Sequence, residues 1–234
     1  MTQIVFSPKW FWGKDIFIDL IGIFVLVLIA VFSMRYYRLK KNKNYLYLAL
    51  SFYIIALAFM SKILTNFTLY HKVLETTTIG LFTITYTRIK NSEILFYIGF
   101  LFYRLFYLFG AYLLYAIYEK QSKPNMVLVS FFIIVSTFFS VSPFSYYIFH
   151  ISSLMLLGIV TYKYYNTYRK NKHPATRMLA SSFAVISSSH LFFMLVNAEK
   201  NFYVAAEILQ LIGYVALLIT FITVLRHGRE KNKN

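Results

Sequence analysis

The chain has no cysteine, and only four prolines and eight acidic residues among its 234 residues. Without cysteine, disulfide bonds, a thiolate nucleophile and a thiolate metal site are excluded. Pro8, Pro124, Pro143 and Pro174 all fall in expected loops or at the ends of apolar segments. Because proline is what most often breaks a membrane helix, unwound half-helix sites are not expected.

Apolar residues dominate instead: 59% of the chain is hydrophobic, 21% is aromatic, and the mean hydropathy is +0.60. This composition is that of an integral membrane protein. A helix needs about 20 apolar residues to cross a bilayer, and runs of that length leave no room for a soluble catalytic domain. We expect one all-α membrane domain, residues 1–234, with seven spanning helices at approximately 16–35, 45–65, 94–118, 126–142, 145–165, 176–197 and 202–225.

The basic residues predict the orientation of these spans. Sixteen of the 24 Lys and Arg residues lie in the first-to-second, third-to-fourth and fifth-to-sixth loops and in the carboxyl-terminal tail. The positive-inside rule therefore places the amino terminus outside and the carboxyl terminus in the cytoplasm, in a multi-pass protein of the cell membrane. The net charge of +16 is scattered over loops that also contain tyrosine, which favours anionic lipid headgroups and disfavours nucleic acid as the partner of these loops.

The sequence also contains a candidate internal repeat. An offset of 131 residues pairs the first two spans with the fifth and sixth, and an offset of 103 pairs the third span with the seventh. The matched residues include Ser51 with Ser182, Phe52 with Phe183, Ile55 with Ile186, Gly110 with Gly213, Leu114 with Leu217, and Arg104 with Glu207. We expect a parallel repeat of residues 16–118 and 145–225, joined by the span 126–142.

The long loop from Asn66 to Glu93 separates the second and third spans. Residues 82–87 within it, Phe-Thr-Ile-Thr-Tyr-Thr, alternate apolar and polar side chains. Alternation of this kind is typical of a strand with one buried face. We expect a short β-hairpin here, resting on the outer mouth of the bundle.

Seven spans in a three-plus-one-plus-three arrangement, with the amino terminus outside, resemble the superfamily of microbial rhodopsins and SWEET-type sugar transporters. In rhodopsins the corresponding loop forms an outer hairpin, as expected here for residues 82–87. The resemblance covers most of the chain, as topology only. The Schiff-base lysine that the rhodopsins carry in the last span is missing between Phe202 and Leu225, and the transporter prolines are missing as well. Covalent retinal is therefore not expected, and we expect no cofactor.

Enzyme motifs are also missing. An intramembrane metal site needs three or more His, Asp or Glu ligands at one depth, and the only histidines within spans are His150 and His190, without an HExxH pattern. The sequence contains neither a glycine-rich phosphate loop nor a nucleophile elbow. We therefore expect no catalytic residues and no metal ligands.

The polar groups within the spans gather in the outer half. At about 1.5 Å of rise per residue, Asp19 and Lys62 lie roughly 5 Å inside the outer boundary, Glu207 roughly 8 Å, His190 roughly 10 Å and Arg104 roughly 15 Å. Gln210 lies at a similar depth, and the cytoplasmic halves have almost no ionisable side chains. The expected site is thus an outward-facing polar pocket of Arg104, Glu207, His190, Gln210, Asp19 and Lys62. Against this, Asp19 and Lys62 are expected to extend to the interface, and His190 is expected to form an ordinary interhelical hydrogen bond.

Arg104 lies near the midplane and needs a partner. An unpaired arginine there costs at least about 2.5–3.5 kcal/mol on insertion scales, more than cation–π contacts of about 0.5–2 kcal/mol return. By elimination among the acidic residues, we expect a buried ion pair between Arg104 and Glu207, with Gln210 and His190 as secondary partners. Its role could be to fix helix register, or to serve in ligand binding or in a proton-linked function.

Two function classes remain. In the first, the protein is a non-enzymatic sensor, receptor-like protein or assembly subunit that acts through a partner protein or as a homo-oligomer. In the second, it is a small transporter or ion channel with the outer charges as its entry site. Unbroken helices and an apolar cytoplasmic half favour the first.

Overall fold

The computed structural model describes residues 7–78, 89–117, 130 and 143–230. All regular structure in these ranges is helical. A short 3-10 helix, η1 (Lys9–Phe11), leads into the α-helices, which are α1 (Lys14–Lys40), α2 (Lys43–Thr78), α3 (Ile89–Ala116), α5 (Pro143–Asn171), α6 (Pro174–Met194) and α7 (Asn201–Glu230).

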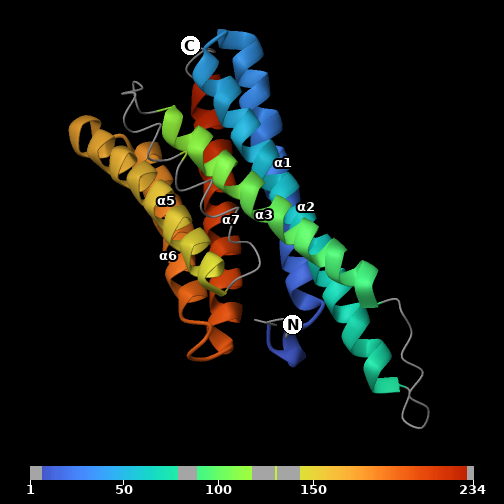
Figure 1. Cartoon of the computed structure of the whole chain (residues 1–234). Coiled ribbons are helices and arrows are strands. Elements are labelled where there is room, and N and C mark those ends of the chain that lie inside the picture. The colour runs from blue at the N-terminus through green and yellow to red at the C-terminus, as the bar shows by residue number, and fades with distance from the viewer. Residues whose placement is uncertain (1–6, 79–88, 118–129, 131–142, 231–234) are drawn as a thin grey trace.

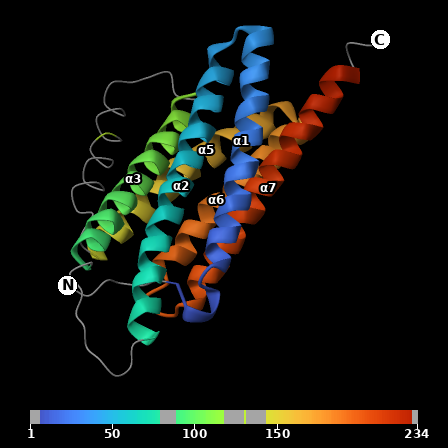
Figure 2. The ribbon, with the colours of Figure 1, turned by 90° about the vertical axis from the view of Figure 1, so that its right-hand side faces the viewer.

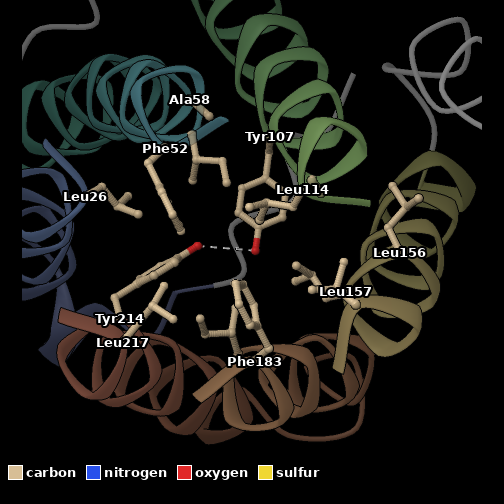
Figure 3. Close-up of a cluster of buried hydrophobic side chains, with 14 of the residues drawn as sticks. Leu26, Phe52, Ala58, Tyr107, Leu114, Leu156, Leu157, Phe183, Tyr214 and Leu217 are labelled. Atoms are coloured by element: carbon tan, nitrogen blue, oxygen red, sulfur yellow. Dashed lines mark hydrogen bonds between the residues drawn. The ribbon is translucent and has the colours of Figure 1, made fainter. Parts of the chain in front are cut away.

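The α-helices pack as a closed ring. Each contacts its neighbours in the order α1, α2, α3, α5, α6, α7, and the ring closes where α7 packs against α1. Figures 1 and 2 show the helices packed side by side along the length of the bundle. Figure 3 shows the interior of the ring, where side chains from all six described α-helices meet. This arrangement lets residues on opposite sides of the ring meet in the core.

Among the described residues, five helices contain a segment long and apolar enough to cross a membrane: Lys14–Lys40 in α1, Lys43–Thr68 in α2, Phe96–Ala116 in α3, Phe144–Asn171 in α5 and Asn201–Val224 in α7. The protein is therefore a multi-pass membrane protein. Helix α6 corresponds to the expected span 176–197, but it does not meet the same hydropathy criterion because it contains five serines, three of them consecutive. The expected fourth span, 126–142, lies outside the described residues except for residue 130.

The second-to-third loop is shorter than predicted. Helix α2 continues to Thr78 and α3 begins at Ile89, so much of the segment 66–93 is helical. The predicted span ended at residue 65, where the apolar run ends, whereas backbone hydrogen bonding continues α2 for 13 more residues to Thr78. The expected hairpin residues 82–87 lie outside the described residues.

The core of the ring is filled by aliphatic and aromatic side chains. Leu26, Phe52, Leu114, Phe183 and Leu217, from five of the helices, are all almost completely buried in one cluster. Because lipid is as apolar as leucine, burial alone gives little gain here, and close packing contributes most of the stabilisation. Polar residues in this part of the core are hydroxyls that bond to helix carbonyls, such as Ser51 Oγ to Gly110 O at 2.6 Å.

Two helix contacts in this core have the same geometry. A Cβ atom added at Gly110 would lie 2.5 Å from Ile55 Cγ1 and 3.0 Å from the carbonyl oxygen of Ser51. One added at Gly213 would lie 2.4 Å from Ile186 Cγ1 and 3.3 Å from the carbonyl oxygen of Ser182. Only glycine therefore allows α3 to approach α2, and α7 to approach α6, this closely.

The turns after α1 and α5 are also alike. Lys41 and Lys172 have positive φ angles of 54° and 52°. Each donates its backbone N–H to the carbonyl oxygen four residues earlier, Tyr37 and Tyr168 respectively, at 2.7 Å. These left-handed residues end each helix and turn the chain back into the next one.

Candidate functional site: a buried charged triad and a tyrosine–histidine network

Lys62 lies between two carboxylates inside the ring. Its Nζ is 2.8 Å from Asp19 Oδ1 and 2.6 Å from Glu207 Oε1. The three residues come from α2, α1 and α7 and are no more than 6% exposed. We call Asp19, Lys62 and Glu207 the charged triad. Removing one partner of a buried ion pair is strongly destabilising, so the triad fixes these three helices to one another.

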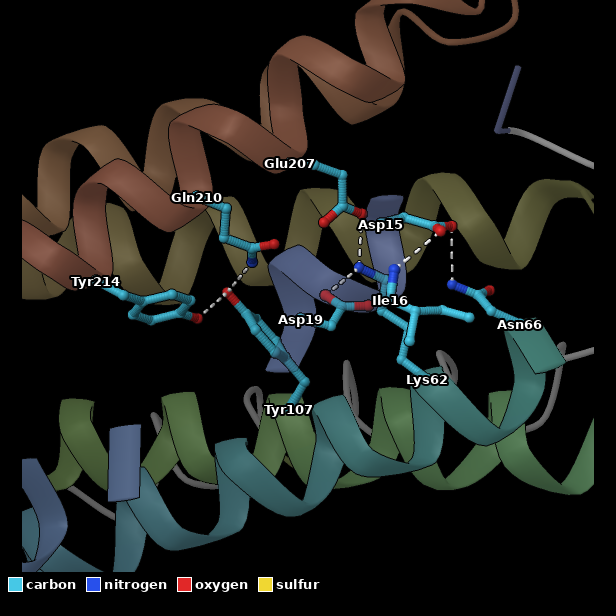
Figure 4. Close-up of polar contacts among 9 residues, drawn as sticks. All are labelled: Asp15, Ile16, Asp19, Lys62, Asn66, Tyr107, Glu207, Gln210 and Tyr214. Atoms are coloured by element: carbon cyan, nitrogen blue, oxygen red, sulfur yellow. Dashed lines mark hydrogen bonds and ion pairs between the residues drawn. The ribbon is translucent and has the colours of Figure 1, made fainter. Parts of the chain in front are cut away.

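A second polar contact joins α1 to α2 one helical turn away. Asn66 Nδ2 donates to Asp15 Oδ2 at 3.1 Å, and the backbone N–H of Ile16 donates to Asp15 Oδ1 at 2.9 Å. Asp15 precedes Asp19 by four residues and Asn66 follows Lys62 by four, so both pairs lie on matching faces of the two helices. Antiparallel packing of α1 and α2 therefore forms two neighbouring polar contacts between these helices, Asp19 with Lys62 and Asp15 with Asn66 (Figure 4).

The expectation that Asp19 and Lys62 extend to the interface is wrong. Both side chains point into the ring, where they are 1% and 6% exposed. The reason is electrostatic, because each finds an opposite charge in the core. Estimating depth along each helix gave the level of these residues but not the face on which they lie.

Arg104 is fully buried, at 1% exposure, but not with a carboxylate. Its Nη1 donates to Ser145 Oγ on α5 at 2.5 Å. The guanidinium carbon lies 4.2 Å from the ring centre of Phe100 and 5.9 Å from that of Phe149, within the range of cation–π attraction. Its Nε has no hydrogen-bond partner among the described residues.

The predicted Arg104–Glu207 ion pair is therefore wrong. In the described part of the chain Glu207 pairs with Lys62, and Arg104 bonds to Ser145. In the ring, α3 lies between α2 and α5 and away from α7, so the guanidinium turns toward α5. Lys62 extends from α2 into the gap between α1 and α7 and takes both carboxylates.

Tyr107, one turn after Arg104 on α3, is the centre of a second network. Its hydroxyl oxygen accepts from Gln210 Nε2 at 3.2 Å and from the Tyr214 hydroxyl at 3.4 Å, both on α7. The same hydroxyl lies 2.9 Å from His190 Nε2 on α6, and His190 Nδ1 lies 2.9 Å from His150 Nδ1 on α5. This tyrosine–histidine network thus joins α3, α5, α6 and α7.

The six candidate residues are all buried, but they do not form one cluster. Asp19, Lys62 and Glu207 meet in the charged triad, Gln210 and His190 meet on Tyr107, and Arg104 lies apart on Ser145. The predicted interhelical hydrogen bond of His190 is present. Among the described residues, no group of three His, Asp or Glu side chains is close enough to hold a metal ion.

Sequence reasoning did not assign Tyr107, Tyr214, His150 or Ser145 to the site. Tyrosine is so frequent in this chain, with 21 occurrences, that no single one is prominent. A signal was nevertheless present, because Tyr107 follows Arg104 by three residues and Tyr214 follows Gln210 by four, which places each on the polar face of its helix. The pairing of His150 with His190 has no signal in local spacing, since 40 residues separate them.

Comparison with known proteins gives no match. No family model matches the chain, and neither a curated protein nor a solved structure matches it significantly.

Proposed function

We propose that the protein is a non-enzymatic sensor or receptor-like subunit of the cell membrane, which responds at its outer face and acts through a partner protein. The observation that carries the proposal is the charged triad, which ties α1, α2 and α7 together at one end of the closed ring. Ionisable residues inside a membrane are costly and usually serve a function.

The triad gives the bundle a way to respond. Separating Lys62 from either carboxylate leaves a buried charge unpaired, which costs about 3–5 kcal/mol. A ligand or proton that compensates that charge therefore changes which positions of α1, α2 and α7 are stable. Because helices are rigid, a shift at the triad would reach the opposite ends of α1 and α7, where Arg38, Lys40 and Arg226 lie. Those ends would contact the partner and anionic lipid.

The rest of the core supports signalling over transport. All buried Asp, Glu, Lys, Arg and His side chains in the described ranges belong to the polar networks above: Asp15, Asp19, Lys62, Arg104, His150, His190 and Glu207. The core beyond them is filled by tightly packed apolar residues. The six described α-helices are continuous, and the prolines within them, Pro143 and Pro174, are first residues.

The proposed topology has seven spans, with residues 126–142 as the linker between two parallel three-helix units. Two duplicated features support the repeat: the Gly110 and Gly213 contacts and the Lys41 and Lys172 turns, which the offsets of 103 and 131 relate to each other. The positive-inside rule still places the amino terminus outside. In this topology the triad lies toward the outer face.

A small-solute or ion transporter is the alternative. The observation that favours it is the tyrosine–histidine network, since linked hydroxyl and imidazole groups can pass protons. The sensor and the transporter differ in what the purified protein does without a partner. In proteoliposomes that contain only this protein, a transporter would give proton or solute flux, whereas a sensor subunit gives none and co-purifies with a partner in fixed ratio.

Because the chain has no cysteine, spin labels can test the signalling path directly. Cysteines placed at Leu39 and Val224, both exposed near the far ends of α1 and α7, give one inter-helix distance by pulsed electron paramagnetic resonance. Asp19→Asn releases α1 from Lys62 and is expected to shift or broaden this distance distribution. The matched control, Glu199→Gln, neutralises an exposed carboxylate. Identical distributions in both variants and the parent would refute the proposed coupling.

A further inference from the structure

The amide group of Gln210 is only half satisfied. Its Nε2 donates to Tyr107, but its Oε1 is buried and has no hydrogen-bond partner among the residues that the structure describes. The side chain is 2% exposed, so bulk water does not reach it. Buried acceptors almost always have a donor, so the identity of the donor to this oxygen is an open question.

The neighbour that could supply the donor is Glu207. It precedes Gln210 by three residues on α7, which places both on one face of the helix. In Figure 4 the amide oxygen of Gln210 and one carboxylate oxygen of Glu207 face each other, while the other oxygen of Glu207 accepts from Lys62. An ionised carboxylate has no hydrogen to donate, so ionised Glu207 would place two acceptors face to face. A protonated Glu207 would donate to Gln210.

The charges around Glu207 have opposite effects on the protonation of its carboxyl group. Asp15 and Asp19 on α1 disfavour a second negative charge and so favour the proton, whereas Lys62 on α2 and Arg104 on α3 favour the ionised form. The other titratable side chains of this part of the core are Tyr103 and Tyr107 on α3, Tyr146 and His150 on α5, His190 on α6, and Tyr203 and Tyr214 on α7. A carboxyl group between such opposing charges can be switched by a small change in its surroundings.

The hydrogen bonds beyond Gln210 run in one direction. The Tyr107 oxygen accepts from Gln210 Nε2 and from the Tyr214 hydroxyl, so both of its lone pairs are used. Its own hydrogen is then donated to His190 Nε2. Neutral His190 must carry its hydrogen on Nδ1 and donate it to His150 Nδ1, which leaves the hydrogen of neutral His150 on Nε2.

We infer that Glu207 is a proton-binding site and that its carboxyl hydrogen is donated to Gln210 Oε1. The bound proton joins the charged triad to the tyrosine–histidine network in one chain of hydrogen bonds, from Lys62 to His150. When Glu207 releases the proton to water, the Gln210 amide turns and donates its N–H to the carboxylate. Its oxygen then accepts from the Tyr107 hydroxyl, which no longer donates to His190. The proton alone enters or leaves, and no covalent bond in the chain other than Glu207 O–H changes.

This inference goes beyond the proposed function and does not depend on a partner protein or on spin-label distances. It assigns Glu207 as the group that binds the proton and Gln210 as a positioning residue, which reports the state of Glu207 to the two histidines. The two proposals can therefore fail separately.

Infrared spectroscopy of the full chain in lipid tests the proton directly. The carbonyl stretch of a protonated carboxyl group is expected in the parent protein, and it should shift when glutamate is labelled with ¹³C. Glu207→Gln should remove the band, and the exposed-site control Glu199→Gln should keep it. A parent spectrum without such a band, or a band that ¹³C-glutamate does not shift or that Glu207→Gln retains, would overturn the inference.

Nitrogen-15 spectra of the histidines provide a test that needs only the parent chain. At the pH where the carboxyl band is present, we expect His190 with its hydrogen on Nδ1 and His150 with its hydrogen on Nε2. Glu207→Gln should keep this pattern, because the new amide can donate to Gln210, whereas Gln210→Leu should abolish the preference. The opposite tautomers in the parent protein would show that the Gln210 amide is turned the other way and that Glu207 is ionised.

Discussion

The polar half and the apolar half of the ring hold their helices together in different ways. In the polar half, side chains bond across the core, as Lys62 does to α1 and α7 and as Tyr107 does to α6 and α7. In the apolar half, buried hydroxyls such as Ser182 and Thr220 bond to carbonyls of their own helix, Ser51 bonds to a carbonyl of α3, and most of the contact between helices is close packing. Charge pairing selects particular partners, whereas packing selects shape. A change in charge therefore acts directly on only one of the two halves.

The largest effect is expected in the polar half. Lys62→Met leaves the Asp19 carboxylate buried without its cation, so the free energy of unfolding should fall by about 3–5 kcal/mol. Thermal unfolding in detergent, followed by fluorescence of the two tryptophans, measures the change. Lys43→Met, at the exposed start of α2, is the matched control and should change stability by less than about 0.5 kcal/mol. Equal stability of the two variants would show that the triad does not hold the helices together.

A smaller effect is expected in the apolar half. Gly213→Ala places a Cβ atom 2.4 Å from Ile186 Cγ1 and 3.1 Å from the Ile186 backbone nitrogen. Such overpacking typically costs about 1–3 kcal/mol. Adding Ile186→Ala removes the nearer atom and should recover part of the stability lost in the single variant. If Gly213→Ala melts at the parent temperature, α6 and α7 are farther apart than described.

The smallest effect is expected at Arg104, although it is as deeply buried as Lys62. Arg104→Met removes a cation that has no carboxylate partner in the described structure, so no uncompensated charge is left behind. We expect the free energy of unfolding to change by about 1 kcal/mol or less in either direction. Unfolding measured beside Lys62→Met tests this contrast. A loss as large as that of Lys62→Met would show that Arg104 has a counter-ion.

The sequence allowed the helices to be predicted more reliably than their contacts. Composition and apolar length gave the membrane class and five of the spans, because a lipid environment forces long helices. The same apolar character hid the orientation of each helix, since α1, α5 and α7 are apolar nearly all round and have little amphipathic contrast. A residue could be placed along its helix but not around it. Arg104 and Glu207 were assigned to each other because their depths were compatible, whereas the ring order brings Glu207 to Lys62.

Helix α2 is longer than the membrane requires, and its length has a mechanical consequence. Its 36 residues, Lys43–Thr78, span about 54 Å at 1.5 Å per residue, whereas the hydrocarbon core of a bilayer is about 30 Å thick. The helix continues for about 24 Å beyond Lys62, so its carboxyl-terminal end extends past the charged triad and out of the bilayer. The protruding end and Lys62 therefore belong to one rigid helix. A molecule that pushes this end sideways would displace Lys62 relative to Asp19 and Glu207 without entering the membrane.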